Sequence, residues 1–232
     1  FGAAGKRYLA ILQKEPGLSI ESIQVISSRY EMLRQSDLAF EVEFTNRLRG
    51  EFGTADLVIV ASATELHESH LDQVFGHRTN ILIEKPATGR PHTYQGYLKL
   101  LHSKTSSFRT GYMWRKHPVI QLMRRVVTQR SYGELLAYRA SWSEFVGHWH
   151  PGEDHTVSYS TREETGGPLK TLSHIIDTMI FIVGRNNLNL NMKCLKNYAQ
   201  SSLTEGIKSE TSVDIIGSLS NGGSINLHAD YF

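Results

Sequence analysis

Short runs of consecutive apolar residues, separated by stretches with helical spacing, are the feature that most constrains the fold of this chain. The two clearest runs are residues 57–61 and 81–83. A strand that is apolar at every position is typical of a parallel sheet with both faces covered. Since amphipathic helical segments alternate with these runs, we predict an α/β fold with a doubly wound parallel sheet.

The elements expected in the first part of the chain follow one another as helix, strand, strand, helix, strand, helix and strand. Pro16-Gly17 ends the first helix, because neither residue continues a helical pattern well. The other elements are bounded by changes in hydrophobic spacing. We predict them near residues 8–12, 23–26, 57–61, 66–74, 81–83, 94–101 and 108–114.

The pattern changes after residue 115, where strands begin to follow one another without helices between them. Asn221-Gly222-Gly223 separates two of these strands and is typical of a hairpin turn. We therefore predict a dinucleotide-type domain at residues 1–115 and a second, α+β domain at 116–232 with an open, mainly antiparallel sheet. Its expected elements are a helix at 118–127 ended by Gly133, a strand at 135–142, an irregular stretch at 143–165, a helix at 169–183, and strands at 192–198, 213–219 and 224–231.

Composition excludes several classes of partner. The chain has 25 Lys and Arg against 23 Asp and Glu, a net charge of +2, which is too balanced to indicate nucleic acid binding. No apolar run approaches the length of a membrane span, so we expect no membrane insertion. The single cysteine, Cys194, cannot form an internal disulfide and fits a reducing compartment, so we expect a cytoplasmic location.

Glycines near the start of the chain indicate a nucleotide site. Gly2 and Gly5 have the spacing of the last two glycines of the G-x-G-x-x-G turn of Rossmann-type folds. Such a turn lets the backbone approach a pyrophosphate, and the N–H groups at the start of the next helix attract its charge. A plain turn remains the alternative, since the first glycine and the strand before it would lie upstream of Phe1.

The end of the next predicted strand favours NADP over NAD. An acidic residue at this position would bind the ribose hydroxyls of NAD. The sequence here reads Ser27-Ser28-Arg29, with hydroxyls and a guanidinium that suit a ribose 2′-phosphate. The alternative is that Arg29 is an ordinary surface arginine.

Glu84-Lys85-Pro86 follows a predicted buried strand, at the sheet edge where ligands of open α/β sheets bind. Proline biases Lys85 away from helical geometry and ends the strand in a turn. An ammonium group there could donate a hydrogen bond to a substrate oxygen and take part in proton transfer. The alternative is a surface lysine at the end of a strand.

The helix expected at 169–183 is two-sided, with Lys170, His174 and Asp177 opposite its apolar face. These residues either face solvent or face the cleft between the domains, where His174 could exchange a proton with a substrate hydroxyl. The stretch before it is rich in aromatic rings and histidines, but its spacings match no zinc motif, so we predict no metal site. These side chains either contact a sugar or serve packing: Trp142, His148, Trp149, His150, His155 and Tyr159.

Five segments, in order along the chain, resemble the Gfo/Idh/MocA oxidoreductase family, which contains glucose–fructose oxidoreductase and inositol dehydrogenase. Each segment is common alone, and the five together are specific. They are residues 2–9 (the second half of the nucleotide loop), 56–64 with His67, 83–86 (the E-K-P signature), 111–115, and Gly166-Gly167 followed by His174, Asp177 and Gly184.

The resemblance implies hydride transfer between NADP or NAD and a sugar-like or polyol substrate. It makes Lys85 the catalytic lysine, with a cis bond to Pro86, and places His174 in the active site beside the nicotinamide and Lys85. The expected substrate contacts are Arg115, Trp149, Lys170 and Asp177. The expected cofactor contacts are Gly2, Ala4, Gly5, Lys6, Arg7, Ser28, Arg29, Ala61, Ser62, Thr64, His67, Glu84, Lys85 and Pro86.

Some features depart from the family pattern. Many members carry an aspartate three or four residues before the histidine, where this chain has Thr171 and Lys170, and residues 62–64 lack the usual Thr-Pro pair. Residues 149–154 resemble members from bacterial sugar or nonulosonic-acid pathways. Two other functions therefore stay open: a cofactor-binding regulatory protein without turnover, and a reductase of another C=O or C=N substrate.

The resemblance also carries expectations about assembly and about the ends of the chain. Family members tend to associate through the open face of the second sheet, so we expect a homo-oligomer, a dimer or a tetramer. A complete member would need a central first strand before Phe1 and more sheet after Phe232. We therefore expect the natural protein to extend at both ends.

Overall fold

The computed structural model describes residues 2–27, 42–45, 55–75, 77, 79–89, 95–97, 107–149, 154–189, 191–202 and 204–232. The chain divides into two compact units, Phe1–Gly111 and Tyr112–Phe232, which are treated separately below. Neither unit has, among its described residues, a helix long and apolar enough to cross a membrane.

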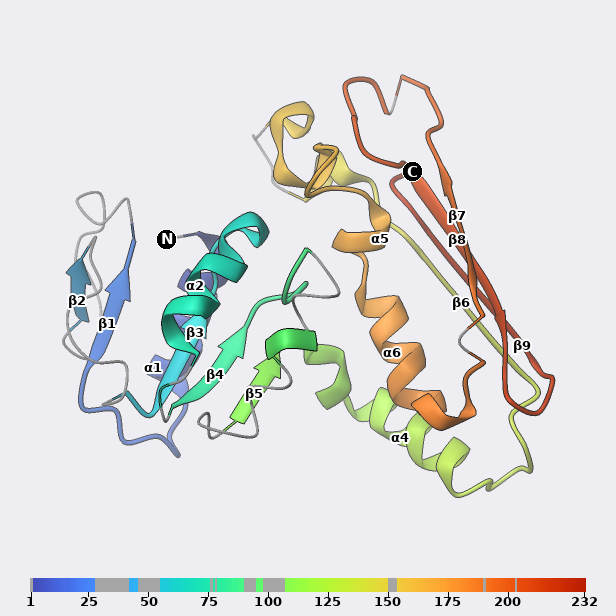
Figure 1. The fold of residues 1–232 in the computed structure, drawn as a ribbon, viewed down its shortest axis with the longest axis horizontal. Coiled ribbons are helices and arrows are strands. Elements are labelled where there is room, and N and C mark those ends of the chain that lie inside the picture. The colour runs from blue at the N-terminus through green and yellow to red at the C-terminus, as the bar shows by residue number, and fades with distance from the viewer. Residues whose placement is uncertain are drawn as a thin grey trace. The chain divides into compact units, whose positions relative to one another are not determined.

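The first unit contains parallel strands, as its apolar runs predict (Figure 1). Two sheets are present, one of β1 (Ile23–Ile26) with β2 (Val42–Thr45), and one in the order β3-β4-β5. The three-stranded sheet comprises β3 (Leu57–Val60), β4 (Asn80–Ile83) and β5 (Ser107–Thr110). Its register pairs Val60 with Ile83 and Ile83 with Thr110, so the three strands end at one edge.

Helices of the first unit also follow the predicted spacing. α1 spans Ala3–Lys14 and ends before Pro16-Gly17, and α2 spans His67–Val74 after a short 3-10 helix at Thr64–Leu66. α2 buries Leu71 and Val74 in the apolar core of this unit, with 0% and 3% of their surfaces exposed. Of the helix expected near 94–101, only residues 95–97 are described, and they are helical. The core consists of Val60, Leu71, Val74, Ile81, Ile83, Ala87, Tyr97 and Phe108.

Two details of the first unit differ from the sequence prediction. Leu57 is 45% exposed, so β3 is not buried on both faces along its whole length. The strand expected at 108–114 was predicted too long, because β5 ends at Thr110 and a 3-10 helix occupies Met113–Lys116. A Cβ on Gly111 would lie 3.1 Å from the Tyr8 hydroxyl, so a glycine allows the backbone to approach α1 closely where the strand stops.

The second unit has the open, mainly antiparallel sheet that we predicted. Its order is β6-β9-β8-β7, with β6 parallel to β9 and the other pairs antiparallel. The Leu219 N–H donates a 2.7 Å hydrogen bond to the Gly223 carbonyl oxygen, which closes the turn between β8 and β9. Gly222 in this turn has a positive φ of 87°. The strands are β6 (Ala137–Ser143), β7 (Lys193–Asn197), β8 (Ser212–Ser218) and β9 (Ser224–Asp230).

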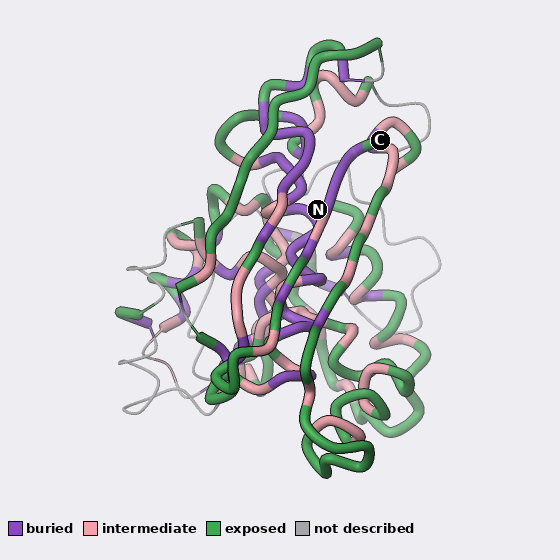
Figure 2. The backbone as a smooth tube through the Cα atoms, turned by 90° about the vertical axis from the view of Figure 1, so that its right-hand side faces the viewer, coloured by how far each residue is buried: buried purple, intermediate pink, exposed green. Residues whose placement is uncertain are grey.

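Helices cover one face of this sheet and leave the other face open (Figures 1 and 2). α5 (Pro168–Thr171) and α6 (His174–Val183) pack on the strands, and α4 (Pro118–Thr128) packs on α6. Alternate strand residues point into the core, as expected for a half-covered sheet. The core consists of Tyr138, Leu172, Ile175, Met179, Ile182, Val183, Leu188, Val213, Ile215, Leu219, Ile225, Leu227 and Ala229.

The single helix expected at 169–183 is wrong, because two helices meet there at Leu172-Ser173. Leu172 has φ −96° and ψ 20°, which interrupts the helical hydrogen bonding. α5 begins after Gly167, whose φ of 91° and ψ of 150° are accessible only to glycine. A Cβ on Gly167 would also lie 2.3 Å from the carboxyl group of Glu210. The break places Lys170 on a different helix from His174.

α4 ends at Thr128, within one residue of the predicted helix at 118–127, and Arg130 takes the left-handed conformation with φ 51° before Gly133. One further stretch differs from expectation. The stretch expected to be irregular holds short 3-10 helices in its described part, at Val146–His148, His155–Val157 and Tyr159–Thr161. Each of the last two is preceded by a side chain, Asp154 or Ser158, that accepts a hydrogen bond from a backbone N–H.

Candidate active site

The ends of two parallel strands in the first unit gather six of the predicted cofactor residues. Ala61, Ser62 and Thr64 follow β3, and Glu84-Lys85-Pro86 follows β4 in the same register. The Lys85-Pro86 bond is cis, as the resemblance implied. Ligands of open parallel sheets bind at this carboxyl edge, so the fold provides the expected setting for a nucleotide.

The carboxylate of Glu84 connects a tyrosine of α1 with the backbone that follows β4. The Tyr8 hydroxyl, on α1, donates to Oε1 of Glu84 at 2.8 Å, and the backbone N–H of Lys85 donates to Oε2 at 3.2 Å. Burial and the neighbouring Glu84 carboxylate both raise the pKa of Tyr8, so its hydroxyl stays a donor at all physiological pH values. Glu84 is therefore a link between α1 and the backbone of Lys85.

His67 makes a second link to the same segment. Its side chain is 1% exposed, with Nδ1 2.9 Å from the Pro86 carbonyl oxygen and Nε2 3.0 Å from the Ser62 carbonyl oxygen. The imidazole thus connects the segments that follow β3 and β4. We predicted His67 as a cofactor contact, and the structure gives both of its nitrogens backbone partners.

The N-terminal turn of α1 fits the pyrophosphate of a dinucleotide. Gly2 precedes the helix, is exposed, and has no protein atom within 4 Å of the position of an added Cβ. The exposed Lys6 and Arg7 add positive charge to the same turn, whose free N–H groups already attract anions. Ala4 is half-buried and Gly5 is buried, and Ser28 and Arg29 lie outside the described residues.

His174 is the first residue of α6 and lies among aromatic rings of the second unit. Its imidazole stacks on Trp114 at 5.5 Å between centroids, with Tyr112 edge-on at 5.6 Å and Trp142 tilted at 6.2 Å. Trp114 in turn stacks on Trp142 at 4.6 Å. His174 is 8% exposed, so the alternative that it lies on a solvent face is excluded.

Asp177, one turn further along α6, is fixed by Arg115. The Nε atom of Arg115 donates to both carboxylate oxygens, at 3.1 and 2.9 Å, and its NH2 group donates a third bond. The Asp177 side chain is 7% exposed and that of Arg115 is 45% exposed. Both were predicted as substrate contacts, and the structure joins them as a bidentate pair that orients α6 against the segment leading from Tyr112.

Where the resemblance led us to expect an aspartate, the chain has a buried hydroxyl network. Thr171 lies 2.6 Å from the Tyr231 hydroxyl and donates to the Gly167 carbonyl at 2.8 Å, and Tyr231 donates to Ser160 O. Burial is the main reason that the pKa of Tyr231 is raised. The Lys170 ammonium donates to the carbonyls of Glu163 and Glu164, so it stabilises the turn before α5.

Trp149 packs inside the second unit. Its ring meets Tyr231 edge-on at 5.5 Å and contacts the apolar core. Its role as a substrate contact stays a prediction. Across the described part of the chain, no group of three or more His, Cys, Asp or Glu side chains could hold a metal ion.

Three of the residues described above were not singled out from the sequence. Tyr8 was assigned to a helix, and Tyr112 and Trp114 to a strand, and all three lay in the family-like segments without a role of their own. The available signal was their position, because Tyr112 and Trp114 directly follow Gly111 at the end of a parallel strand. A Gly-Tyr-Met-Trp-Arg segment at such a place combines a close backbone approach with rings that suit ligand binding.

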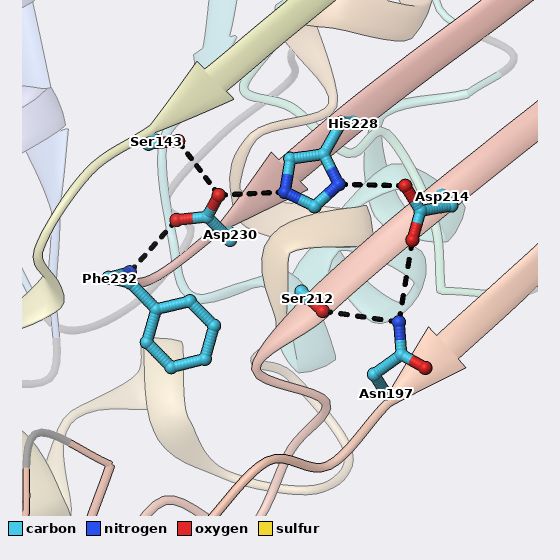
Figure 3. Close-up of polar contacts among 7 residues, drawn as sticks. All are labelled: Ser143, Asn197, Ser212, Asp214, His228, Asp230 and Phe232. Carbon is cyan, nitrogen blue, oxygen red and sulfur yellow. Dashed lines mark hydrogen bonds and ion pairs between the residues drawn. The ribbon is translucent and has the colours of Figure 1, made fainter. Parts of the chain in front are cut away.

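A separate polar cluster lies on the open face of the second sheet (Figure 3). His228 on β9 bridges two carboxylates, with Nδ1 2.7 Å from Asp214 Oδ1 and Nε2 2.8 Å from Asp230 Oδ2. Ser143 on β6 donates to Asp230, and Asn197 on β7 donates to Asp214. The cluster therefore links all four strands across a face without covering helices.

We predict that this cluster makes stability depend on pH. Hydrogen bonding to Asp214, and then to Asp230, raises the pKa of His228 above its usual 6.5 although burial opposes this. The stabilisation is therefore complete below about pH 6.5 and is lost as pH rises through the raised pKa. Because His228 is 39% exposed, solvent screening limits the effect to about 0.5–1 kcal/mol.

Urea unfolding of the parent and of His228→Gln at several pH values between about 5.5 and 9 measures this dependence. The parent should lose stability over this interval, and the variant should show a flatter profile. Equal slopes in the two proteins would contradict the assignment.

Comparison with known proteins agrees with the fold. Residues 1–112 match the sequence model described as "Oxidoreductase family, NAD-binding Rossmann fold". Residues 1–112, just under half of the chain, thus match the Gfo/Idh/MocA oxidoreductase family that the motifs predicted. No curated protein matches the chain at a significant level.

Solved structures share the fold of both units at low sequence identity. An NAD-binding protein from Listeria innocua is 14% identical, with a TM-score of 0.73 over 100% of this chain and 63% of its own. GenD2 from gentamicin A biosynthesis, in complex with NAD, is 17% identical, with a TM-score of 0.79 over 99% of this chain and 63% of its own. Levoglucosan dehydrogenase in complex with NADH and levoglucosan is 15% identical, with a TM-score of 0.63 over 76% and 48%. This chain thus spans about half to two thirds of the length of these proteins.

Proposed function

We propose that the protein is an NAD(P)-dependent dehydrogenase that acts on a hydroxyl or carbonyl carbon of a sugar, sugar derivative or polyol. The observation that carries the proposal is the placement of Lys85 in a fixed segment at the carboxyl edge of a parallel sheet. A bound nicotinamide supplies the hydride acceptor or donor at this edge. The chain's own residues then have to orient the substrate and move one proton.

Lys85 and His174 are the residues we assign to proton transfer. The Lys85 ammonium donates a hydrogen bond to the reacting substrate oxygen, and as the free amine it accepts the hydroxyl proton when the alcohol is oxidised. His174 provides a second titratable group, as an imidazole commonly does. The proposal requires that both residues serve the same substrate.

The rings around His174 support a sugar-like substrate. Trp142 and His174 are 4.6 and 5.5 Å from Trp114 but only 6.2 Å from each other. Rings on opposite faces of Trp114 would be separated by nearly the sum of the first two distances. Both therefore lie on one side of Trp114, and neither takes its other face, which is an apolar surface suited to the C–H face of a sugar ring.

A second candidate function is cofactor binding without turnover. It is favoured by the hydroxyl network at Thr171, where many family members have a carboxylate. A reductase of another C=O or C=N substrate is a third candidate on the same fold. Nicotinamide absorbance with a panel of aldoses, ketoses, amino sugars, uronic acids and cyclitols, in both reaction directions, separates these candidates. Absence of turnover with every member, despite NAD(P) binding, would leave the non-catalytic function as the better account.

We propose a preference for NADP that depends on Arg29, which follows β1 outside the described residues. The parent should bind NADPH more tightly than NADH, because a guanidinium forms charge-assisted hydrogen bonds with the 2′-phosphate. Arg29→Asp should narrow or reverse this difference, by about tenfold or more for loss of one such contact. Titration of nucleotide fluorescence measures both constants, and equal affinities in the parent would refute this role.

We also propose that the protein forms a homo-oligomer through the open face of the second sheet. Leu195 is 53% exposed and Ile216 49% exposed on this face, which is unusual for two apolar side chains on neighbouring strands. Ile216→Lys places a charge there and should shift the mass in light scattering toward the monomer. Arg139→Lys on the same face is the control, and an unchanged mass in Ile216→Lys would exclude this surface.

A further inference from the structure

The buried imidazole of His67 occupies an unusual position for a predicted cofactor contact. It is the first residue of α2, yet its partners are the carbonyl oxygens of Ser62 and Pro86, which belong to two different strand ends. With 1% exposure it has no surface to offer a ligand. Its contacts join the two segments that border the carboxyl edge of β3 and β4.

Either contact is a hydrogen bond only where the imidazole is the donor. A carbonyl oxygen only accepts, so each bond needs a proton on the ring nitrogen that makes it. The neutral ring donates to one carbonyl at a time, whereas the doubly protonated ring donates to both. His70, three residues along α2, has its Nδ1 2.9 Å from the Ser62 hydroxyl, in the segment that follows β3. Burial first, and then His67, lower the pKa of His70.

The second constraint on Lys85 comes from the opposite side. Glu84 accepts the Lys85 backbone N–H and is itself oriented by the Tyr8 hydroxyl on α1. The Pro86 carbonyl, on the other side of Lys85, is held by His67. The backbone of Lys85 thus lies between two anchors, each attached to a different helix.

We infer that His67 is a positioning residue for Lys85: it fixes the Pro86 carbonyl and thereby sets the direction in which the Lys85 side chain leaves the backbone. The inference rests on the proposed function of Lys85 in proton transfer. An ammonium displaced by about 1 Å from its reacting oxygen can cost on the order of a hundredfold in rate. His67 acts through the backbone, so it alters turnover without contacting the nucleotide.

The test compares the parent with His67→Leu, Tyr8→Phe and His70→Leu in three measurements. His67→Leu should raise amide hydrogen exchange at residues 84–88 and lower kcat by about 10- to 100-fold, with the NAD(P)H Kd within about threefold of the parent. Tyr8→Phe should raise exchange at the same residues through Glu84. His70→Leu is the matched control, a histidine of the same helix whose loss should leave exchange at 84–88 unchanged.

His67→Gln covers the case in which His67→Leu does not fold, since an amide group still donates to one carbonyl and should give an intermediate effect. Unchanged exchange at 84–88, or a raised NAD(P)H Kd with kcat retained, would overturn the inference and make His67 a general packing or nucleotide residue. If the parent transfers hydride to no substrate, the proposed function fails. The exchange measurement then still decides whether His67 holds the Lys85 segment.

Discussion

Replacing Lys85 with methionine is expected to lower kcat for hydride transfer by about 10²- to 10⁴-fold, the usual contribution of a positioned proton-transfer group. Methionine retains the apolar stem and removes the ammonium, so the segment held by Glu84 and His67 should keep its backbone contacts. The NAD(P)H Kd should therefore stay within about threefold of the parent value.

Steady-state kinetics with a substrate found in the panel, together with nucleotide titration, measure both quantities. Lys14→Met, at an exposed position in the last turn of α1, is the matched control and should keep the parent kcat. A Lys85→Met protein with unchanged kcat would remove the central residue of the proposed mechanism. Loss of nucleotide binding with folding intact would instead assign Lys85 to the cofactor.

The second large effect is expected at His174. His174→Asn should lower kcat by about 10²- to 10³-fold, because the amide cannot exchange a proton and no longer stacks fully on Trp114. In the Lys85→Met/His174→Asn double mutant, the increase in activation free energy should be smaller than the sum of the increases in the two single mutants. Residues that act on one transition state are not independent of each other.

His117→Asn is the matched control, because His117 is an exposed histidine of the same unit and has no predicted contact with the substrate. Cooperative unfolding of each variant has to be checked, since His174 is buried and its loss could loosen the aromatic cluster. Fully additive effects of Lys85→Met and His174→Asn would show that the two residues do not act on the same step. The proposed pair would then be wrong even if each residue matters alone.

The sequence predicted β3 and β4 well because burial in a parallel sheet leaves a local signal, an unbroken apolar run such as 57–60 or 81–83. It missed β2, which lies in a stretch without such a run. The hairpin at Asn221-Gly222-Gly223 was predictable for a similar reason, since its glycine φ is required locally. The break between α5 and α6 was not, because the apolar spacing continues through Leu172 while the backbone turns.

The candidate site was predicted in its residues and less well in their roles. Lys85 and His174 stood out through the family resemblance. The partners of His67 are 5 and 19 residues away, and those of Tyr8 are 76 residues away, so no local pattern records them. Arg115 and Asp177 were both named, yet their mutual pairing across 62 residues became visible only in three dimensions.

The close contacts around Gly167 restrict which substitutions the turn before α5 and α6 can accept. Any larger residue meets the Glu210 carboxyl group and also has to adopt a backbone conformation with φ 91°. A shorter side chain at 210 would relieve the collision and leave the conformational penalty in place. No single substitution elsewhere therefore makes a larger residue tolerable at position 167. Mutations that alter specificity near His174 should then lie in side chains of the helices and leave the turn at Gly167 unchanged.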